Sequence, residues 1–324
     1  MTLSVRIEQQ GGPEVLQLVE TSVPPPGPGQ LRVRHEAIGL NFIEIYQRSG
    51  VYKIPLPGGL GAEAAGIVDA VGPEVGGFAV GDRIAYAGGP LGAYSEERLL
   101  PAANAVKLPA GVSSEAAAAL MLKGMTAWYL LHQTFPVRPG HTLLVHAAAG
   151  GVASILVPWA KHLGAIVIGT AGSPEKAELA KAAGCDHVLL YRDREFAPEV
   201  RRLTDGAGVD VVYDSVGKDT FNGSLDSLRR RGMMVSFGNA SGKVPPFEPI
   251  LLSEKGSLFL TRPTLAHYTG TRPELEAAAN ALFEVIAKGI VQPQIRRRYP
   301  LREVARAQTE LAGRHTTGSS VLLP

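Results

Sequence analysis

The stretch TLLVHAAAGGVASILV, residues 142–157, places an apolar strand, a turn with two glycines and an apolar helix in direct succession. Such a turn is typical of dinucleotide-binding folds, in which it reads G-x-G-x-x-G or ends in alanine. On that template the three marked positions are Ala148, Gly150 and Ala153, so only the middle glycine is kept. On the motif alone, an ordinary connection between a strand and a helix remains the alternative.

The context of the loop favours a cofactor site. A second apolar strand, AIVIGTA at 165–171, follows one strand–helix–strand unit later. Gly150 lets the backbone approach a pyrophosphate, and the free N–H groups at a helix start favour its charge. Ala148 must then turn without glycine, and Pro158 removes a hydrogen bond to Ser154 inside the helix.

The rest of the chain predicts an α/β fold with two domains. Apolar strands alternate with helical segments from about residue 113 to 292, which predicts a doubly wound parallel sheet of the Rossmann type. The expected strands are TLLVHA, AIVIGTA, HVLLY, VDVVYDSV, MMVSFG and SLFLT. Residues before about 109 and after about 292 are short β-like runs with Gly and Pro turns, which predict a barrel or sandwich completed by the C-terminus.

Composition excludes several classes of protein. The 324 residues carry a net charge of +2, so we expect neither a nucleic-acid nor a membrane partner. The uncharged window 142–160 contains two glycines and a proline, and reads better as a buried strand and helix than as a membrane span. The single cysteine, Cys185, excludes an intrachain disulfide and fits a reducing compartment, so we expect a cytoplasmic protein.

Cofactor preference is indicated where the strand at 165–171 ends. An NAD-binding chain usually has Asp or Glu there for the ribose hydroxyls, but this strand is followed by Gly172 and Ser173. Ser173 and Pro174 predict the N-cap and first residue of a helix. With the acid missing, we interpret Lys176 as a ligand of a 2′-phosphate and expect NADPH; the alternative is an ordinary solvated lysine.

Several segments together resemble the bacterial NADPH:quinone oxidoreductases, in the zeta-crystallin-like, zinc-independent branch of the medium-chain dehydrogenases/reductases. They are GGPEVLQL, AIGLNFIEIYQRSGVY, GLGAEAAGIV, LLVHAAAGGV, VVYDSVG, MMVSFGNASG and TRPTL. The resemblance implies a GroES-like barrel at 1–122 and 293–324, and a Rossmann domain at 123–292 with NADPH in the cleft. It also implies a homodimer, formed by pairing of the last sheet strand near Leu258–Leu260.

The resemblance implies three groups of site residues. Those near the nicotinamide and substrate are Asn41, Tyr46 and Thr126. Those around the pyrophosphate and adenosine phosphate are Ala149, Gly150, Gly151, Val152, Gly172, Ser173, Lys176 and Tyr191. Those lining the nicotinamide half are Ser215, Phe237, Gly238, Asn239 and Arg262.

A zinc site is not expected. Zinc relatives have a cysteine where this chain has Asn41, and a His-Glu pair where it has Ala62 and Glu63. A catalytic zinc needs about three protein ligands, which these positions do not supply. Without a metal the substrate must accept hydride readily, which favours quinones and leaves an enone or alkenal reductase as the alternative.

A third reading is an NADPH-binding, crystallin-like protein with RNA-binding side activity. Its features would be Arg229–Arg231 and Arg296–Arg298. Neither has the interleaved aromatic residues that stacking on single strands needs. We interpret the first as a helix C-terminus and the second as a solvated loop.

Overall fold

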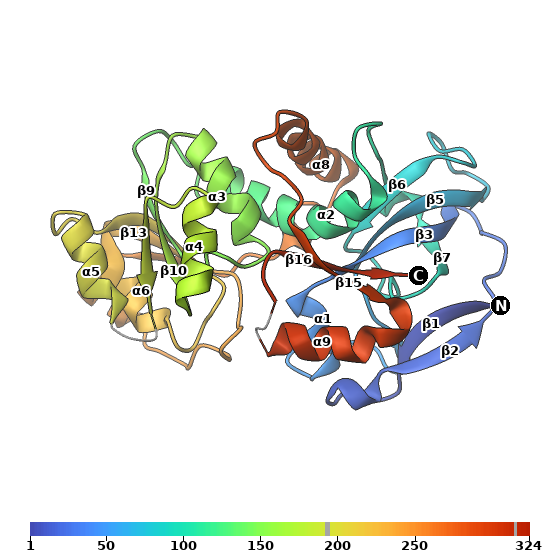
Figure 1. Cartoon of the computed structure of the whole chain (residues 1–324), viewed down its shortest axis with the longest axis horizontal. Coiled ribbons are helices and arrows are strands. Elements are labelled where there is room, and N and C mark those ends of the chain that lie inside the picture. Colours follow the sequence, from blue (N-terminus) through green and yellow to red (C-terminus); the bar gives the residue numbers. More distant parts are fainter. Residues whose placement is uncertain (192–194, 314–315) are drawn as a thin grey trace. The chain divides into compact units, whose positions relative to one another are not determined.

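The computed structural model describes residues 1–191, 195–313 and 316–324 (Figure 1). The chain divides into two compact units. Unit 1 comprises Met1–Met125, Thr269–Ala287 and Pro293–Pro324, and unit 2 comprises Thr126–Tyr268 and Lys288–Gln292. This division differs from the predicted one chiefly at 269–287, where the helix contacts unit 1: Arg272 donates to the Ala105 carbonyl, and the Leu282 side chain lies against Gly124.

Unit 1 is built from two sheets. A three-stranded sheet has the order β2-β1-β4, and a larger one has the order β15-β16-β3-β5-β6-β8, with β7 also paired to β3. The strands are β1 (Thr2–Ile7), β2 (Gln17–Thr21), β3 (Gln30–Leu40), β4 (Gly58–Gly59), β5 (Glu63–Val71), β6 (Arg83–Ala87), β7 (Glu97–Pro101), β8 (Val106–Lys107), β15 (Ile295–Pro300) and β16 (Ser319–Leu323). Because β16 pairs with β3, the C-terminal segment completes the sheet begun near the N-terminus.

Among the described residues, α1 (Phe42–Arg48), α8 (Arg272–Ala287) and α9 (Val304–Ala312) accompany these sheets, and α2 (Ser114–Tyr129) begins in unit 1 and ends in unit 2. β3 begins with alternating side chains, in which Leu31 and Val33 are buried, and from Ala37 onward every side chain is buried. Alternation is typical of a strand with one face on a core. The continuous buried run leads directly to Asn41 and α1, so the strand ends at a fixed position under the helix.

Unit 2 is a six-stranded parallel sheet of order β11-β10-β9-β12-β13-β14. Its strands are β9 (Thr142–Val145), β10 (Ile166–Ala171), β11 (His187–Leu190), β12 (Val209–Asp214), β13 (Leu228–Ser236) and β14 (Phe259–Thr261), and its helices are α3 (Ala153–His162), α4 (Pro174–Ala182), α5 (Phe196–Leu203), α6 (Phe221–Ser227) and α7 (Ile250–Glu254). All six predicted strands are present. The doubly wound α/β fold is therefore confirmed, with β14 at one edge of the sheet.

The two arginine runs are placed differently from the prediction. Arg229–Arg231 belong to β13 and Arg296–Arg298 to β15, whereas we expected a helix end and a loop. β13 pairs with β12 at Leu228 and again from Met233, and the charged run lies between these two paired stretches. Both runs pair with acidic side chains, as Arg229 does with Asp210 and Arg298 with Glu115, each at 2.7 Å.

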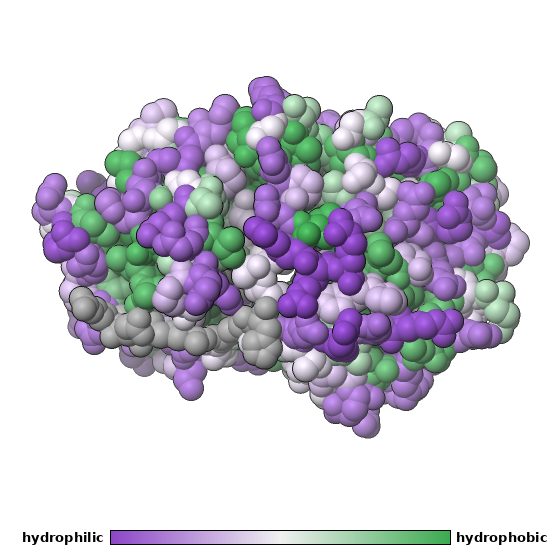
Figure 2. Space-filling view, in the orientation of Figure 1, coloured by the Kyte–Doolittle hydropathy of each residue, from purple (hydrophilic) through white to green (hydrophobic). Residues whose placement is uncertain are grey.

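The window 142–160 forms β9, the glycine turn and most of α3. Among the described residues, no helix is both long enough and apolar enough to span a membrane. Figure 2 shows hydrophilic side chains spread over the visible face of both units, with hydrophobic ones in smaller groups between them.

Candidate cofactor and substrate site

All the cofactor residues predicted in unit 2 lie at the carboxyl edge of its sheet. They follow β9 (Ala149, Gly150, Gly151, Val152), β10 (Gly172, Ser173, Lys176), β11 (Tyr191), β12 (Ser215), β13 (Phe237, Gly238, Asn239) and β14 (Arg262). Ligands of open α/β sheets bind at this edge, where the loops that follow parallel strands meet. Residues spread over more than a hundred positions of sequence thus share one edge.

The glycine turn is made by alanine rather than by glycine. Ala147 has a φ of 51°, in the left-handed region that non-glycine residues seldom adopt. Its carbonyl accepts a hydrogen bond of 2.7 Å from the Gly150 N–H. A Cβ on Gly150 would lie 3.0 Å from that same carbonyl oxygen, a tight contact, so glycine favours this close approach. The loop is therefore a different version of the dinucleotide turn.

Close packing under the loop is supplied by the neighbouring strand. A Cβ on Gly169, in β10, would lie 2.8 Å from both Ala148 Cβ and Cys185 Sγ. Ala148 is fully buried, and its N–H donates to the Thr170 carbonyl at 2.9 Å. The glycine that permits close packing is thus on the strand, and the loop carries alanine.

Helix α3 begins directly behind the turn with no side chain capping its N-terminus. The Ser154 N–H donates to the Gly150 carbonyl at 2.8 Å, which joins the first turn of the helix to the glycine turn. A helix start is a place where an anion is favoured. Pro158 lies inside the helix, which nevertheless continues to His162. Ala153 is buried, as expected for a small residue at helix–strand packing.

The end of β10 is organised as the sequence predicts. Ser173 is the N-cap of α4 and accepts a hydrogen bond from the Lys176 N–H at 3.4 Å, and Pro174 is the first helical residue. Lys176 is half-buried in the first turn of that helix. Tyr191 directly follows β11, and its N–H donates to the Ala171 carbonyl at 3.3 Å. Lys176 and Tyr191 thus belong to adjacent loops.

The loops after β12 and β13 are packed on each other. The Asp214 carbonyl accepts from the N–H groups of Phe237 and Gly238, at 2.8 and 3.3 Å. A Cβ on Gly238 would lie 2.3 Å from the Ser215 carbonyl oxygen, so only glycine fits there. Three of the residues predicted for the nicotinamide half are therefore held together, while Arg262 follows β14 and is exposed.

A buried chain of hydrogen-bonded polar side chains, which we did not predict, connects these loops. His146 Nδ1 lies 2.9 Å from Thr170 Oγ1, and His146 Nε2 lies 2.9 Å from Ser224 Oγ. Ser224 Oγ in turn donates to Asp214 Oδ2 at 2.9 Å. The other carboxylate oxygen, Asp214 Oδ1, accepts from the N–H groups of Val216 and Gly217. Burial lowers the pKa of His146, whereas Asp214 opposes that shift.

In unit 1, Asn41 lies between two buried carboxyl groups. Asn41 Nδ2 donates to Glu63 Oε2 at 2.9 Å and to Glu44 Oε1 at 3.3 Å, and the Asn41 N–H donates to Glu44 Oε2 at 2.6 Å. Glu63 Oε1 accepts from the Leu122 N–H at 2.6 Å, and Lys123 Nζ lies 3.7 Å from Glu63 Oε2. Asn41 is thereby fixed in position at the start of α1.

The carboxyl groups in this cluster are poor acids. Burial raises the pKa of Glu44 to about 8, the Asn41 hydrogen bond opposes the shift, and the Glu63 charge adds to it. Burial also raises the pKa of Glu63, with Lys123 as the main opposing influence. Burial thus favours the protonated form of Glu44 near neutral pH.

The two other residues predicted near the nicotinamide lie on helices. Tyr46 is on α1, where its ring lies edge-on to Tyr52 with 5.4 Å between centroids. Thr126 is buried on α2, one turn after Lys123.

Comparison with known proteins decides the family. Residues 27–110 match the family model of the alcohol dehydrogenase GroES-like domain, and residues 151–284 match that of zinc-binding dehydrogenases. A quinone oxidoreductase of Pseudomonas aeruginosa is 53% identical over the whole of both chains. The chain belongs to the quinone oxidoreductase family. An Escherichia coli quinone oxidoreductase crystallised with NADPH matches with a TM-score of 0.98 and 48% identity, covering 99% of this chain and 100% of that one.

Another relative of this quinone oxidoreductase family member is named for a different reaction. A 2-haloacrylate reductase from a Burkholderia species is 48% identical over 100% of this chain and 99% of its own length.

Around Asn41 and Glu63, the described side chains of this family member are engaged with one another. Both Glu63 oxygens are occupied by protein N–H groups, Asn41 presents its amide nitrogen to them, and the Lys123 ammonium lies beside them. Within residues 1–191, 195–313 and 316–324, no three His, Cys, Asp or Glu side chains are grouped as metal ligands.

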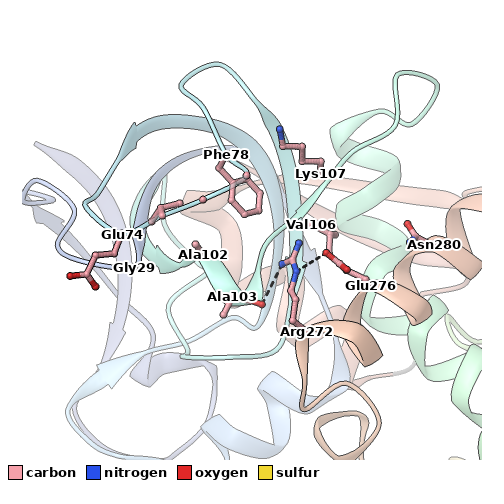
Figure 3. A pocket seen from close by; sticks show the side chains of 13 residues that line it. Gly29, Glu74, Phe78, Ala102, Ala103, Val106, Lys107, Arg272, Glu276 and Asn280 are labelled. Carbon is pink, nitrogen blue, oxygen red and sulfur yellow. Dashed lines mark hydrogen bonds and ion pairs between the residues drawn. The ribbon is translucent and has the colours of Figure 1, made fainter.

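Unit 1 of this family member also contains a cavity of about 720 Å³ (Figure 3). Arg272 and Lys107 each lie 5.8 Å from the Phe78 ring centre there. Arg272 is engaged by Glu276 at 2.8 Å, and Lys107 by Asp82 at 2.8 Å. None of the predicted site residues lines this cavity.

Proposed function

We propose that this chain reduces quinones with NADPH. The main observation is the loop after β10, where a lysine stands in the first turn of α4 and the usual acidic residue is missing. A 2′-phosphate carries charge that Lys176 and the N-terminus of α4 would both stabilise. The E. coli relative crystallised with NADPH supports the same assignment.

The residues of unit 2 would hold the cofactor by its phosphates and its nicotinamide half. Ala149, Gly150, Gly151 and Val152 would surround the pyrophosphate at the start of α3, where the helix N-terminus favours its charge. Gly172, Ser173, Lys176 and Tyr191 would surround the adenosine phosphate. Ser215, Phe237, Gly238, Asn239 and Arg262 would line the nicotinamide half, with Asn41, Tyr46 and Thr126 near the reacting atoms.

When bound, NADPH supplies the hydride, and the protein supplies position and a site from which water is excluded. Because the residues at 41, 62 and 63 do not form a zinc site, the substrate must accept hydride without a Lewis acid. Quinones fulfil this condition, and a hydroquinone anion can take its proton from solvent.

The test is NADPH consumption against a panel of quinones, enals and simple alcohols or ketones. We expect rapid consumption with quinones and none above background with alcohols or ketones. Turnover of ketones at rates equal to those of quinones would overturn the proposal.

Reduction of activated alkenes is the second candidate, because one full-length relative is a 2-haloacrylate reductase. An alkene conjugated to a carboxyl or carbonyl group also accepts hydride without a metal. Comparing kcat/KM for a benzoquinone and a short enal on the same preparation separates the two: a higher value for the enal favours the alkene reductase.

We also propose that the chain forms a homodimer through β14. This strand is the edge of its sheet, and Phe259 on it is 58% exposed. An unpaired strand edge with an exposed aromatic residue readily pairs with a second copy. Light scattering at micromolar concentration should give twice the chain mass, and Phe259→Lys should shift it toward one chain.

We also propose that the protein is located in the cytoplasm. The only cysteine, Cys185, is a buried free thiol, and burial raises its pKa to about 12. Fractionation of cells should recover the protein and its NADPH-dependent quinone reduction together in the cytoplasmic fraction.

A further inference from the structure

The polar chain under the cofactor loops spans three adjacent strands. Thr170 lies in β10, His146 directly follows β9, and Asp214 ends β12. Ser224, on α6, links the histidine to the aspartate. All four side chains are at most 1% exposed, so each hydrogen bond is made away from water. A buried polar chain without alternatives in water holds its members in one arrangement.

Along this chain of hydrogen bonds, each side chain donates toward Asp214. The Asp214 carboxylate accepts from Thr220 Oγ1 and Ser224 Oγ, and from two backbone N–H groups. Since Ser224 has one hydroxyl hydrogen and gives it to Asp214, its oxygen must accept from His146 Nε2–H. The hydrogen bonds thus require a hydrogen on Nε2, and burial, which lowers the pKa of His146, favours the neutral ring over the imidazolium. In the neutral ring Nδ1 carries no hydrogen and accepts from the Thr170 hydroxyl.

Each end of the chain reaches a different part of the predicted cofactor site. Thr170 lies two residues before Gly172, and its carbonyl accepts from the Ala148 N–H of the glycine turn. Asp214 shapes the 215–217 loop through Val216 and Gly217, and its carbonyl holds Phe237 and Gly238. His146 is held further by its own N–H, which donates to the Tyr213 carbonyl at 3.1 Å, and by the edge-on ring of Phe196.

We propose that His146, with Thr170 and Ser224, is a positioning group that fixes the spacing between the adenosine-phosphate loop and the nicotinamide loops. The proposal rests on the proposed NADPH site, which it deepens. The side chains of His146, Thr170 and Ser224 do not touch the cofactor. They set its affinity by holding three loops at one separation, so that NADPH meets a site already arranged.

The first test is a double-mutant cycle on NADPH binding. The fluorescence of the bound nicotinamide measures the binding. Thr170→Val and Ser224→Ala each remove one hydroxyl with little change of shape. We expect each to raise the NADPH Kd by about three- to tenfold. The double variant should raise it by less than the product of the two, because either change already releases the His146 ring.

Ser227→Ala is the matched control. Ser227 is a fully buried serine on the same helix α6, but its hydroxyl bonds to the Gly223 carbonyl at 2.7 Å and lies outside the chain. It should leave the NADPH Kd unchanged even where it lowers the Tm. An equal rise in Kd for Ser227→Ala, or single effects that multiply in the double variant, would overturn the proposal.

The second test needs no variant. The nitrogen chemical shifts of His146 in the ¹⁵N-labelled full chain should report the neutral ring with hydrogen on Nε2. Hydrogen on Nδ1 would contradict the proposed direction of the hydrogen bonds from Thr170 to Asp214. The wild-type measurements separate this proposal from the proposed function. If the wild type does not bind NADPH, the proposed function is contradicted. If the wild type binds NADPH and the variants bind it equally well, only the positioning role is contradicted.

Discussion

Gly39 lies directly against the carboxylate of Glu63: a Cβ on Gly39 would be 2.1 Å from Glu63 Oε2 and 2.6 Å from the Ala118 carbonyl oxygen. The missing side chain in β3 therefore creates the space in which Glu63 reaches Asn41 and Leu122. Gly39 and Glu63 act as one unit, although they lie on different strands.

Gly39→Ala should lower the free energy of unfolding by about 1–3 kcal/mol, because the added methyl group forces Glu63 away from its donors. Urea unfolding measures the change. Gly76→Ala is the control, since a Cβ there meets nothing within 4 Å, and its effect should be close to zero. Equal effects at the two glycines would contradict the packing described for Gly39.

Glu44 makes stability depend on pH in a predictable direction. Its pKa is raised from 4.5 to about 8, so between these values the folded state keeps a proton that the unfolded state has lost. Stability should therefore fall as pH rises, by up to about 1.4 kcal/mol per pH unit. Glu44→Gln removes this contribution. Urea unfolding measures the free energy of unfolding of wild type and of Glu44→Gln. From pH 5 to pH 8, this free energy should fall in wild type relative to the variant. A difference that stays constant would show that Glu44 is ionised in the fold.

Lys176→Ala should weaken NADPH binding by about ten- to a hundredfold and leave NADH nearly unchanged, because only NADPH has the 2′-phosphate. The measurement is the ratio of the two dissociation constants. Raised salt should reduce the wild-type preference by screening the pair. Lys181→Ala is the control on the same helix, where the lysine pairs with Glu178 at 2.9 Å. An unchanged ratio in Lys176→Ala would remove the lysine from the cofactor site.

Tyr46→Phe should reduce quinone turnover while NADPH binding stays intact, if the hydroxyl orients the quinone or the nicotinamide. Steady-state kcat and the NADPH Kd together measure this. Tyr299→Phe provides the comparison, because its hydroxyl donates to Glu310 at 2.7 Å and has no proposed role in the reaction. Full turnover in Tyr46→Phe would mean that the ring only packs.

Prolonged chelation should leave quinone reduction unchanged, because Asn41, Ala62 and Glu63 do not provide a zinc site. Elemental analysis should find far less than one zinc per chain. Activity lost to a chelator and restored by zinc would reverse this reading.

Much of the fold was predictable because its signals are local. Each strand of unit 2 is a short apolar run, and Ser173 with Pro174 marks a helix start that the structure reproduces. The arginine runs misled the prediction, since charged residues have no strand preference of their own; in β13 the run lies between Leu228 and Met233, which pair with β12.

The polar networks were not predictable because their members are far apart in sequence. Nothing near His146 indicates Ser224, 78 residues away, and nothing near Asn41 indicates Lys123. One signal was available: a histidine in an otherwise uncharged apolar stretch needs partners for both ring nitrogens once it is buried.

The position of Lys123 has a consequence for engineering. Asn41→Cys and Ala62→His would return two ligands of the kind that zinc relatives use, beside Glu63. The ammonium group 3.7 Å from Glu63 would still repel a divalent ion and compete for the same oxygen. Converting this scaffold into a metalloenzyme therefore requires removing one cation, as in Lys123→Met, before another can bind.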